Sequence, residues 1–156
     1  MQHGPIHSYP IEPDAITKFE GEHFFLSNFY EGPVPILWNG LIGATIEHVF
    51  QAAKAALGNE RDAILCAPTP GIAKRLGRKC TMRPDWDDVR IETMHRMLLV
   101  KFANPELAAK LLLTGDRQLV EGNWWGDRFW GVDAKKWIGS NHLGELLMQI
   151  RTEIRG

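Results

Sequence analysis

The polar and apolar positions of residues 45–57, TIEHVFQAAKAAL, follow the period of an α-helix. Three polar residues, Glu47, Gln51 and Lys54, fall in one narrow sector beside an apolar face formed by Ile46, Val49, Phe50 and Ala53. Thr45 is placed to cap this helix, which puts Glu47 in the first turn, where free backbone N–H groups favour a carboxylate. The polar line fits a solvated helix edge as well as a ligand site, so other parts of the chain must decide between them.

Similar patterns and breaker residues predict four further helices, over about residues 69–77, 85–104, 104–114 and from Asn141 to the end of the chain. We expect Thr69, Asp85 and Asn141 to cap three of them. The last helix carries an apolar stripe with helical spacing, formed by Leu143, Leu146, Leu147, Ile150 and Ile154. Such a stripe indicates a helix that faces the core.

Strand signals are shorter and fewer. The Asn39-Gly40 dipeptide lies between two apolar runs and predicts a β-hairpin, because both residues readily adopt positive φ values. The segments 15–19 (AITKF) and 117–121 (RQLVE) are strand candidates, and residues 124–133 read as a loop or edge strand. The chain is therefore expected to have an α+β, mainly α-helical fold, with an N-terminal arm at 1–14 and one domain at 15–156.

Composition and charge narrow the class of protein. The chain has 156 residues, of which 44% are hydrophobic and 24% charged, with a formal net charge of −1. This near-neutral balance argues against avid, sequence-independent binding to nucleic acid. Cys66 and Cys80 lack C-x-x-C spacing, and no apolar run approaches the roughly 18 residues of a membrane span. We expect a reduced, cytoplasmic protein with no membrane partner.

Several common catalytic motifs are missing from the sequence. It contains no G-x-G-x-x-G, no Walker-type lysine loop, no G-x-S-x-G and no H-E-x-x-H motif, which disfavours the enzyme classes that carry them. His3 and His7 have i, i+4 spacing, but they lie in a segment with Pro and Gly and are interpreted as part of the arm. Neither a metal site nor a cofactor is expected.

The segment GNWWGDRFWG, residues 122–131, combines aromatic rings with opposite charges. Trp124, Trp125 and Trp130 surround Asp127 and Arg128. Flat rings beside a carboxylate and a guanidinium suit a planar base that is attached to a sugar or phosphate. The alternative is a small hydrophobic cluster under a loop, in which Asp127 pairs with Arg128.

Five other positions are weaker candidates. Trp86 starts the long helix and fits the core at least as well as a site. Arg78 follows Gly77, and with Lys79 it could hold a phosphate, although adjacent cations are more often simply exposed. Ser27 and Asn28 form a common turn pattern that could also bind the edge of a base.

The order of several short motifs resembles the NADAR family, which includes the YbiA-type N-glycosidases. These motifs are FLSNFY, TIEHVFQAAKA, RLGRK, a Trp-initiated helix ending in LLVKF, LLLTGDRQLVE, GDRFWGVD and GSNHLGELLMQIR. The resemblance covers about residues 19–152 and implies hydrolysis of N-glycosidic bonds. The implied substrates are ADP-ribosylated guanine or ribosylaminopyrimidine intermediates of the riboflavin pathway. After Trp130 the sequence GVDAKKWIGSNHLG departs from the glycine-rich pattern of YbiA-type members, which bears on substrate preference.

The resemblance points to Glu47, Trp86, Asp127 and Trp130 as site residues, with Lys54 nearby. The residue patterns described above supply the other candidates. The expected catalytic residues are Glu47, Lys54 and Asp127. The expected substrate-binding residues are Ser27, Asn28, Phe29, Gln51, Arg78, Trp86, Arg128 and Trp130. Glu47 would stabilise positive charge on the sugar, and Asp127 would hold ribose hydroxyls or position water. Lys54 would either hold a phosphate or Glu47, or attack the sugar as a nucleophile.

On this interpretation the α-helical polar line forms one wall of a pocket that the Trp-rich loop covers. The expected partner is a small-molecule nucleotide or ADP-ribose substrate, with ADP-ribosylated nucleic acid as an alternative carrier of the same adduct. Two competing hypotheses remain: a non-catalytic sensor for NAD-derived or ADP-ribose ligands, and a structural interaction domain. Detection of product separates an enzyme from both.

Overall fold

A computed structural model describes residues 8–156 of the chain, so His3 and His7 lie outside the described residues. The chain divides into two compact units, which are considered separately below. One unit is Asn28–Leu107, and the other joins the residues up to Ser27 with Ala108–Gly156. Helix α5, Pro105–Leu113, contains the boundary between them in the sequence. The predicted division into an arm at 1–14 and one domain at 15–156 stays a prediction.

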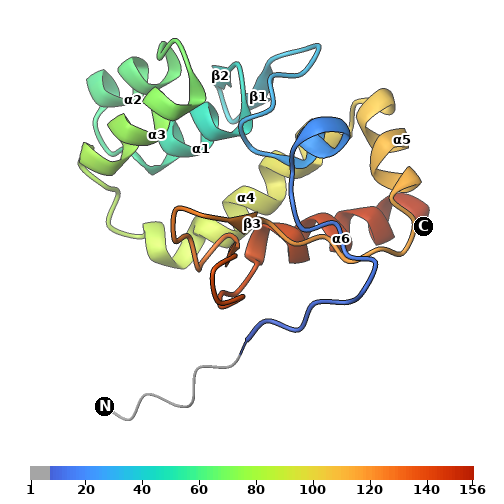
Figure 1. The fold of residues 1–156 in the computed structure, drawn as a ribbon. Coiled ribbons are helices and arrows are strands. Elements are labelled where there is room, and N and C mark those ends of the chain that lie inside the picture. The colour runs from blue at the N-terminus through green and yellow to red at the C-terminus, as the bar shows by residue number, and fades with distance from the viewer. Residues whose placement is uncertain (1–7) are drawn as a thin grey trace. The chain divides into compact units, whose positions relative to one another are not determined.

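Three short helices form the centre of the Asn28–Leu107 unit: α1 at Ile46–Lys54, α2 at Gly58–Leu65 and α3 at Pro70–Lys79 (Figure 1). Their small and apolar side chains make a shared core that contains Ala52, Ala55, Ile64 and Ala73. The fourth helix of this unit, α4, spans Trp86–Phe102. Short side chains at the contacts let the three helix backbones approach one another closely.

Threonine caps begin α1 and α3, as the sequence predicts. The hydroxyl oxygen of Thr45 accepts a hydrogen bond from the N–H of His48, and that of Thr69 accepts one from Ile72. Helix α1 ends at Lys54 instead of continuing to residue 57, because the Lys54 carbonyl accepts the N–H of Arg83. Helix α2 is absent from the predicted elements, because its sequence GNERDAIL shows no clear apolar stripe. In the structure only Ile64 of this helix is buried.

The predicted β-hairpin is confirmed. Strand β1, Ile36–Trp38, pairs antiparallel with β2, Leu41–Gly43. The two turn residues, Asn39 and Gly40, have φ values of 49° and 82°. Positive φ at both positions gives a turn whose twist matches that of the strands, and the hairpin leads directly into α1.

In the other unit, the two predicted strands are wrong. Residues 15–19 and 117–121 form only an isolated parallel bridge between Ile16 and Leu119. One more backbone bond follows this bridge, from the N–H of Gly122 to the Thr17 carbonyl at 3.0 Å. The regular parallel pair is formed by β3, Gly122–Asn123, and β4, Val132–Asp133. Among the described residues this unit also contains the 3-10 helix η1, Gly21–Leu26, and the long helix α6, His142–Arg155.

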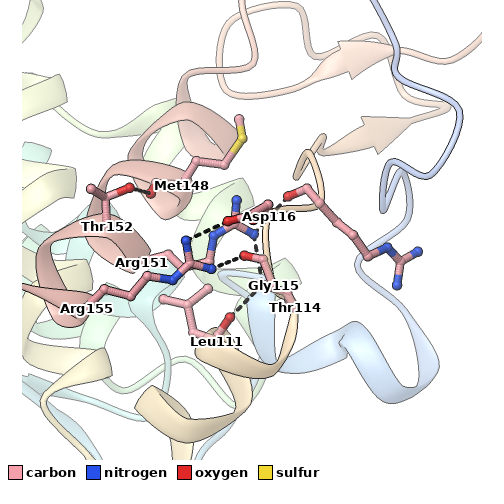
Figure 2. Close-up of polar contacts among 9 residues, drawn as sticks. Leu111, Thr114, Gly115, Asp116, Met148, Arg151, Thr152 and Arg155 are labelled. Atoms are coloured by element: carbon pink, nitrogen blue, oxygen red, sulfur yellow. Dashed lines mark hydrogen bonds and ion pairs between the residues drawn. The ribbon is translucent and has the colours of Figure 1, made fainter.

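Helix α6 is fixed by its apolar stripe and by two arginines. Leu143, Leu146, Leu147 and Ile150 of the predicted stripe are buried. Figure 2 shows Arg151 and Arg155 directed from α6 toward the turn that follows α5. Arg151 Nη1 donates to the Thr114 hydroxyl at 2.9 Å, and Arg155 Nη1 contacts Asp116 at 2.7 Å. These bonds hold the turn at the end of α5, where the predicted stop at residues 114–115 is confirmed.

Two predicted caps act differently in the structure. Asn141 precedes α6 with a left-handed φ of 52°, but its Oδ1 accepts the N–H of Glu121 at 3.0 Å and not an N–H of the helix. Asp85 precedes α4, but its carboxylate forms an ion pair with Arg83 at 2.6 Å. The predicted α+β, mainly helical class is nevertheless confirmed. None of the helices between residues 8 and 156 is long and apolar enough to cross a membrane.

Candidate active site

The polar line on α1 is a chain of side-chain hydrogen bonds. Gln51 Nε2 donates to Glu47 Oε1 at 2.9 Å, and Lys54 Nζ donates to Gln51 Oε1 at 3.4 Å. Glu47 is 7% exposed, while Gln51 and Lys54 are half-buried. The amide of Gln51 therefore bridges an acidic and a basic group along one side of the helix.

Asn28 lies beside the start of this line. Its carbonyl oxygen accepts the N–H of Glu47 at 3.1 Å, and its side-chain amide points to the Met94 sulfur at 3.7 Å. Asn28 is 7% exposed, and its Oδ1 has no hydrogen-bond partner within the described part of the chain. An unsatisfied buried acceptor of this kind costs free energy.

Helix α3 contacts the line through a glycine that the sequence analysis did not select as a functional residue. A Cβ atom added at Gly77 would lie 2.0 Å from Gln51 Oε1 and 2.6 Å from Gln51 Cδ. Only a residue without a side chain can therefore stand beside the Gln51 amide in its present position. Gly77 lies in the motif RLGRK, which marks the position in the sequence but not its contact with Gln51.

The last turn of α3 adds charge and a thiol near the line. Arg78 and Lys79 are exposed. The Cys80 thiol donates to the Gly77 carbonyl at 3.2 Å. Burial raises the pKa of this thiol, and the nearby Lys54 charge opposes that rise.

Trp86 and Phe29 lie in the same unit as α1. Trp86 is 4% exposed, and its ring packs against Phe50 with centroids 4.9 Å apart. This contact is a core contact and leaves little of the ring for a ligand. Lys74 Nζ lies 5.8 Å from the centre of the Phe29 ring. The predicted roles of Trp86 and Phe29 in binding stay predictions.

In the other unit, the aromatic loop at 123–131 is braced by Asn123, which the sequence analysis did not select. Asn123 is fully buried; its amide donates to the Asp127 carbonyl at 2.8 Å, and its Oδ1 accepts the Asp127 N–H at 2.9 Å. The carboxylate of Asp127 in turn accepts the N–H groups of Phe129 and Trp130 at 2.9 and 3.0 Å, through Oδ1. One oxygen of Asp127 is thus used to shape the loop.

Arg128 pairs with Asp133 and not with Asp127. The contact from Arg128 Nη2 to Asp133 Oδ2 measures 3.2 Å. The pKa of Asp133 is lowered, chiefly by the N–H of Lys135 and then by Arg128. The simple alternative of an Asp127–Arg128 ion pair is therefore wrong, and the charged groups of this loop have separate partners.

The remaining predicted residues of this unit occupy different settings. The ring of Trp130 is half-buried and meets Phe129 edge to face, with centroids 4.9 Å apart. Trp124 and Trp125 are 61% and 64% exposed. Ser27 ends η1, where its N–H donates to the Phe24 carbonyl at 2.9 Å. Asp127, Arg128 and Trp130 therefore belong to one braced loop.

A cavity of about 180 Å³ in the Asn28–Leu107 unit contains none of the predicted site residues. It is lined by apolar side chains together with Tyr30, Lys101 and Asn104. Lys101 is 3% exposed, its Nζ lies 5.5 Å from the Tyr30 ring centre, and burial lowers its pKa to about 7. This buried cation is a feature of the α4 core, separate from the line on α1.

Comparison with known proteins shows to which family this chain belongs. The profile of the NADAR domain matches residues 17–155. The chain belongs to the NADAR domain family. It is 36% identical over 150 residues to N-glycosidase YbiA of Escherichia coli, covering 92% of this chain and 91% of that protein. The NMR structure of the E. coli protein YbiA matches with a TM-score of 0.77 and 33% identity, over 93% of this chain and 88% of that one.

Two other relatives carry different names. N-glycosidase Npun_R5314 of Nostoc punctiforme is 44% identical over 119 residues, which are 72% of this chain and 74% of that protein. Riboflavin biosynthesis protein VVA0006 of Vibrio vulnificus is 38% identical over 154 residues. The match covers 97% of this chain but only 39% of the Vibrio protein. A NADAR domain like this one thus occurs both in proteins of similar length and within a longer protein.

Proposed function

We propose that this NADAR protein is an N-glycosidase in which Glu47 and Lys54 act on the sugar side of the bond that is cleaved. The observation that carries the proposal is the hydrogen-bonded line from the carboxylate of Glu47 through Gln51 to the amine of Lys54. A carboxylate and an amine held on one side of a helix can approach one sugar ring from the same direction.

The reaction class follows from membership of the family. The chain is a hydrolase of N-glycosyl bonds, because it belongs to the NADAR family and spans nearly all of relatives named N-glycosidase YbiA. Cleavage of a C1′–N bond develops positive charge on the sugar. A carboxylate such as Glu47, largely removed from water, is well suited to stabilise that charge.

Lys54 has two proposed roles. As a cation, it holds a phosphate or the carboxylate of Glu47. As a neutral amine, it attacks C1′ while the C1′–N bond breaks and the base nitrogen takes up a proton. The C1′–O4′ bond then breaks to leave an imine on Lys54, as the amine proton passes to O4′. Water hydrolyses this imine, which releases the sugar and regenerates the amine.

Borohydride reduction during turnover distinguishes the two roles. If Lys54 attacks the sugar, reduction converts the imine to a stable secondary amine, and peptide mass analysis finds the sugar on Lys54. If turnover proceeds at the same enzyme concentration and no adduct is trapped, while Lys54→Arg keeps substantial activity, direct attack by water is the better mechanism.

For the substrate, we favour an ADP-ribosyl adduct on guanine. Arg78 and Lys79 stand next to Gly77, whose backbone touches Gln51, and both cations are exposed. Two adjacent cations beside the line suit the two phosphates of ADP-ribose better than a single phosphate. A nucleic acid that carries the adduct would present the same group.

A ribosylaminopyrimidine intermediate is the second candidate, and the names of two relatives favour it. VVA0006 and the maize protein PYRR are both named riboflavin biosynthesis proteins. The match to the maize protein covers 72% of this chain and 20% of that protein. Both candidate substrates present a ribose with a nitrogen at C1′, so the same carboxylate and amine could serve either.

Parallel steady-state assays on ADP-ribosylated guanosine and on the ribosylaminopyrimidine test this proposal. A higher kcat/KM for the guanosine adduct is expected, and a clearly higher value for the pyrimidine would reverse the ranking of substrates. Calorimetry on the same samples measures binding. Binding of ADP-ribose without product from either substrate would contradict an enzyme and support a sensor.

A further inference from the structure

The amide of Gln51 has a fixed orientation because its two ends have different partners. Its Nε2 donates to Glu47, and its Oε1 accepts from Lys54. Rotation of the amide by half a turn would present Oε1 to a carboxylate oxygen and Nε2 to an ammonium group, and neither pair could form a hydrogen bond. The residue thus contacts both proposed catalytic groups, and each contact depends on where its amide lies.

The backbone of α3 limits that position from the other side. A Cβ atom at residue 77 would lie 2.0 Å from Gln51 Oε1, 2.6 Å from Cδ and 3.0 Å from Cβ. The first two separations are far below van der Waals contact. Gly77 is buried, so the Gln51 amide could escape such a Cβ only by leaving its contacts with Glu47 and Lys54.

The same helix contains a matched glycine without such a neighbour. Around Gly71, the nearest atom to an added Cβ is the Thr69 hydroxyl oxygen at 3.9 Å, an ordinary contact. Substituting Ala at either position changes helix propensity in the same direction. Gly71→Ala is therefore a control: it adds a methyl group to α3 and changes its helix propensity without a clash at Gln51.

We infer that Gln51 is a positioning residue that holds Glu47 and Lys54 in register, and that Gly77 keeps the Gln51 amide in place. The inference rests on the proposed function for its effect on catalysis, because it takes Glu47 and Lys54 as the reacting groups. It assigns Gln51 to the support of those groups and not to the substrate.

A double-mutant cycle tests this arrangement. Gln51→Ala is expected to lower kcat by about 10²-fold with KM unchanged, a size known for misplaced catalytic groups. Gly77→Ala is expected to lower kcat similarly, and Gly71→Ala to leave it unchanged. In the double variant, the clash with Oε1 and Cδ is gone and the added Cβ meets only the Cβ of residue 51, at 3.0 Å, so Gly77→Ala is expected to add little loss beyond that of Gln51→Ala.

Three results would overturn the inference. Gly77→Ala could retain the wild-type kcat, the two losses could add in the double variant, or Gln51→Ala could raise KM without changing kcat. The last result would make Gln51 a substrate ligand. If Gly77→Ala alone fails to fold, the double variant with Gln51→Gly decides, because it also removes the Cβ at 3.0 Å. A folded protein with the activity of the single Gln51→Gly variant supports the inference, and loss of folding only when Gly77→Ala is added contradicts it.

A second readout does not depend on turnover. Trace acetylation with acetic anhydride, followed by peptide mass analysis, measures the relative reactivity of Lys54. Its reactivity is expected to change in Gln51→Ala and Gly77→Ala and to stay at the wild-type value in Gly71→Ala. If the wild-type protein cleaves neither substrate, the proposed function fails, while this labelling pattern still supports or contradicts the positioning role.

Discussion

Helix α1 and the loop at 123–131 contain similar side chains but use them differently. Both combine a carboxylate with a basic residue and aromatic neighbours. On α1, Glu47 accepts a hydrogen bond from the side chain of Gln51, while the helix satisfies most of the backbone. In the loop, the carboxylate of Asp127 accepts two backbone N–H groups, those of Phe129 and Trp130.

The difference shows what regular structure makes possible. A helix binds its own backbone groups, so its side chains remain available for other contacts. An irregular loop has no such pairing, and a short acidic side chain becomes a partner for its N–H groups. For this reason Glu47 is the stronger candidate for catalysis, and the catalytic role of Asp127 stays a prediction that needs its own test.

Among the substitutions other than Glu47→Gln, the largest effect is expected at Lys54. Arg keeps the positive charge but cannot attack as a neutral amine, so Lys54→Arg is expected to lower turnover by about 10²-fold or more if Lys54 is the nucleophile. Single-turnover product formation measures the change. A loss of less than about threefold in a folded variant would leave Lys54 as a charge only, and α1 would then contribute no nucleophile.

Trp130 tests the loop as a binding surface. If its ring stacks on the base, Trp130→Ala should weaken ligand binding by about 1–3 kcal/mol, the value found for bases stacked on aromatic side chains. Trp124→Ala in the same loop serves as the control, because Trp124 is 61% exposed and has no assigned contact with the base. Equal affinities for wild type and Trp130→Ala by calorimetry would make the loop structural.

Lys101 differs from Lys54 because it is buried in the core instead of lying on the polar line of α1. Burial lowers its pKa to about 7 in the folded protein, whereas an unfolded lysine titrates near 10.4. Between these values the unfolded chain binds more protons, so stability should rise with pH, by about 2 kcal/mol from pH 7 to 9. Chemical denaturation at both pH values should show this rise in the wild type and not in Lys101→Met.

The smallest expected effect, on stability, is at Asp127, where two substitutions separate a structural role from a catalytic one. Asn keeps an oxygen that can accept the N–H groups of Phe129 and Trp130, so Asp127→Asn should unfold at nearly the wild-type temperature. Asp127→Ala removes that acceptor and should cost about 1 kcal/mol, as for a lost cap. If Asp127 also acts in catalysis, Asp127→Asn loses activity in spite of its stability; unchanged activity would restrict the residue to the loop.

Local signals predicted much of the fold. The Thr45 and Thr69 caps, the Asn39-Gly40 turn and the stripe on α6 depend on neighbouring residues, and each is confirmed. The segments at 15–19 and 117–121 have the composition of strands, but their pairing depends on the path of distant chain segments and is limited to one bridge and the backbone bonds beside it. Composition alone could not reveal that.

In the candidate site, too, local patterns could be predicted and tertiary contacts could not. Helical spacing was sufficient to align Glu47, Gln51 and Lys54. The role of Gly77 depends on how α3 packs against α1, and the role of Asn123 depends on its burial under the loop. Both residues occur within motifs that the sequence analysis singled out, but their function arises from tertiary contacts that no spacing rule describes.

The central claim is that the carboxylate of Glu47 stabilises the transition state of N-glycosidic cleavage. The most direct test compares binding and single-turnover cleavage of ADP-ribosylated guanosine, and of the ribosylaminopyrimidine, by the wild type and by Glu47→Gln. Gln keeps the shape of the side chain but removes its charge. We expect similar binding and a cleavage rate lower by about 10²–10³-fold. Near-normal cleavage of the preferred substrate by a folded Glu47→Gln protein would contradict the claim.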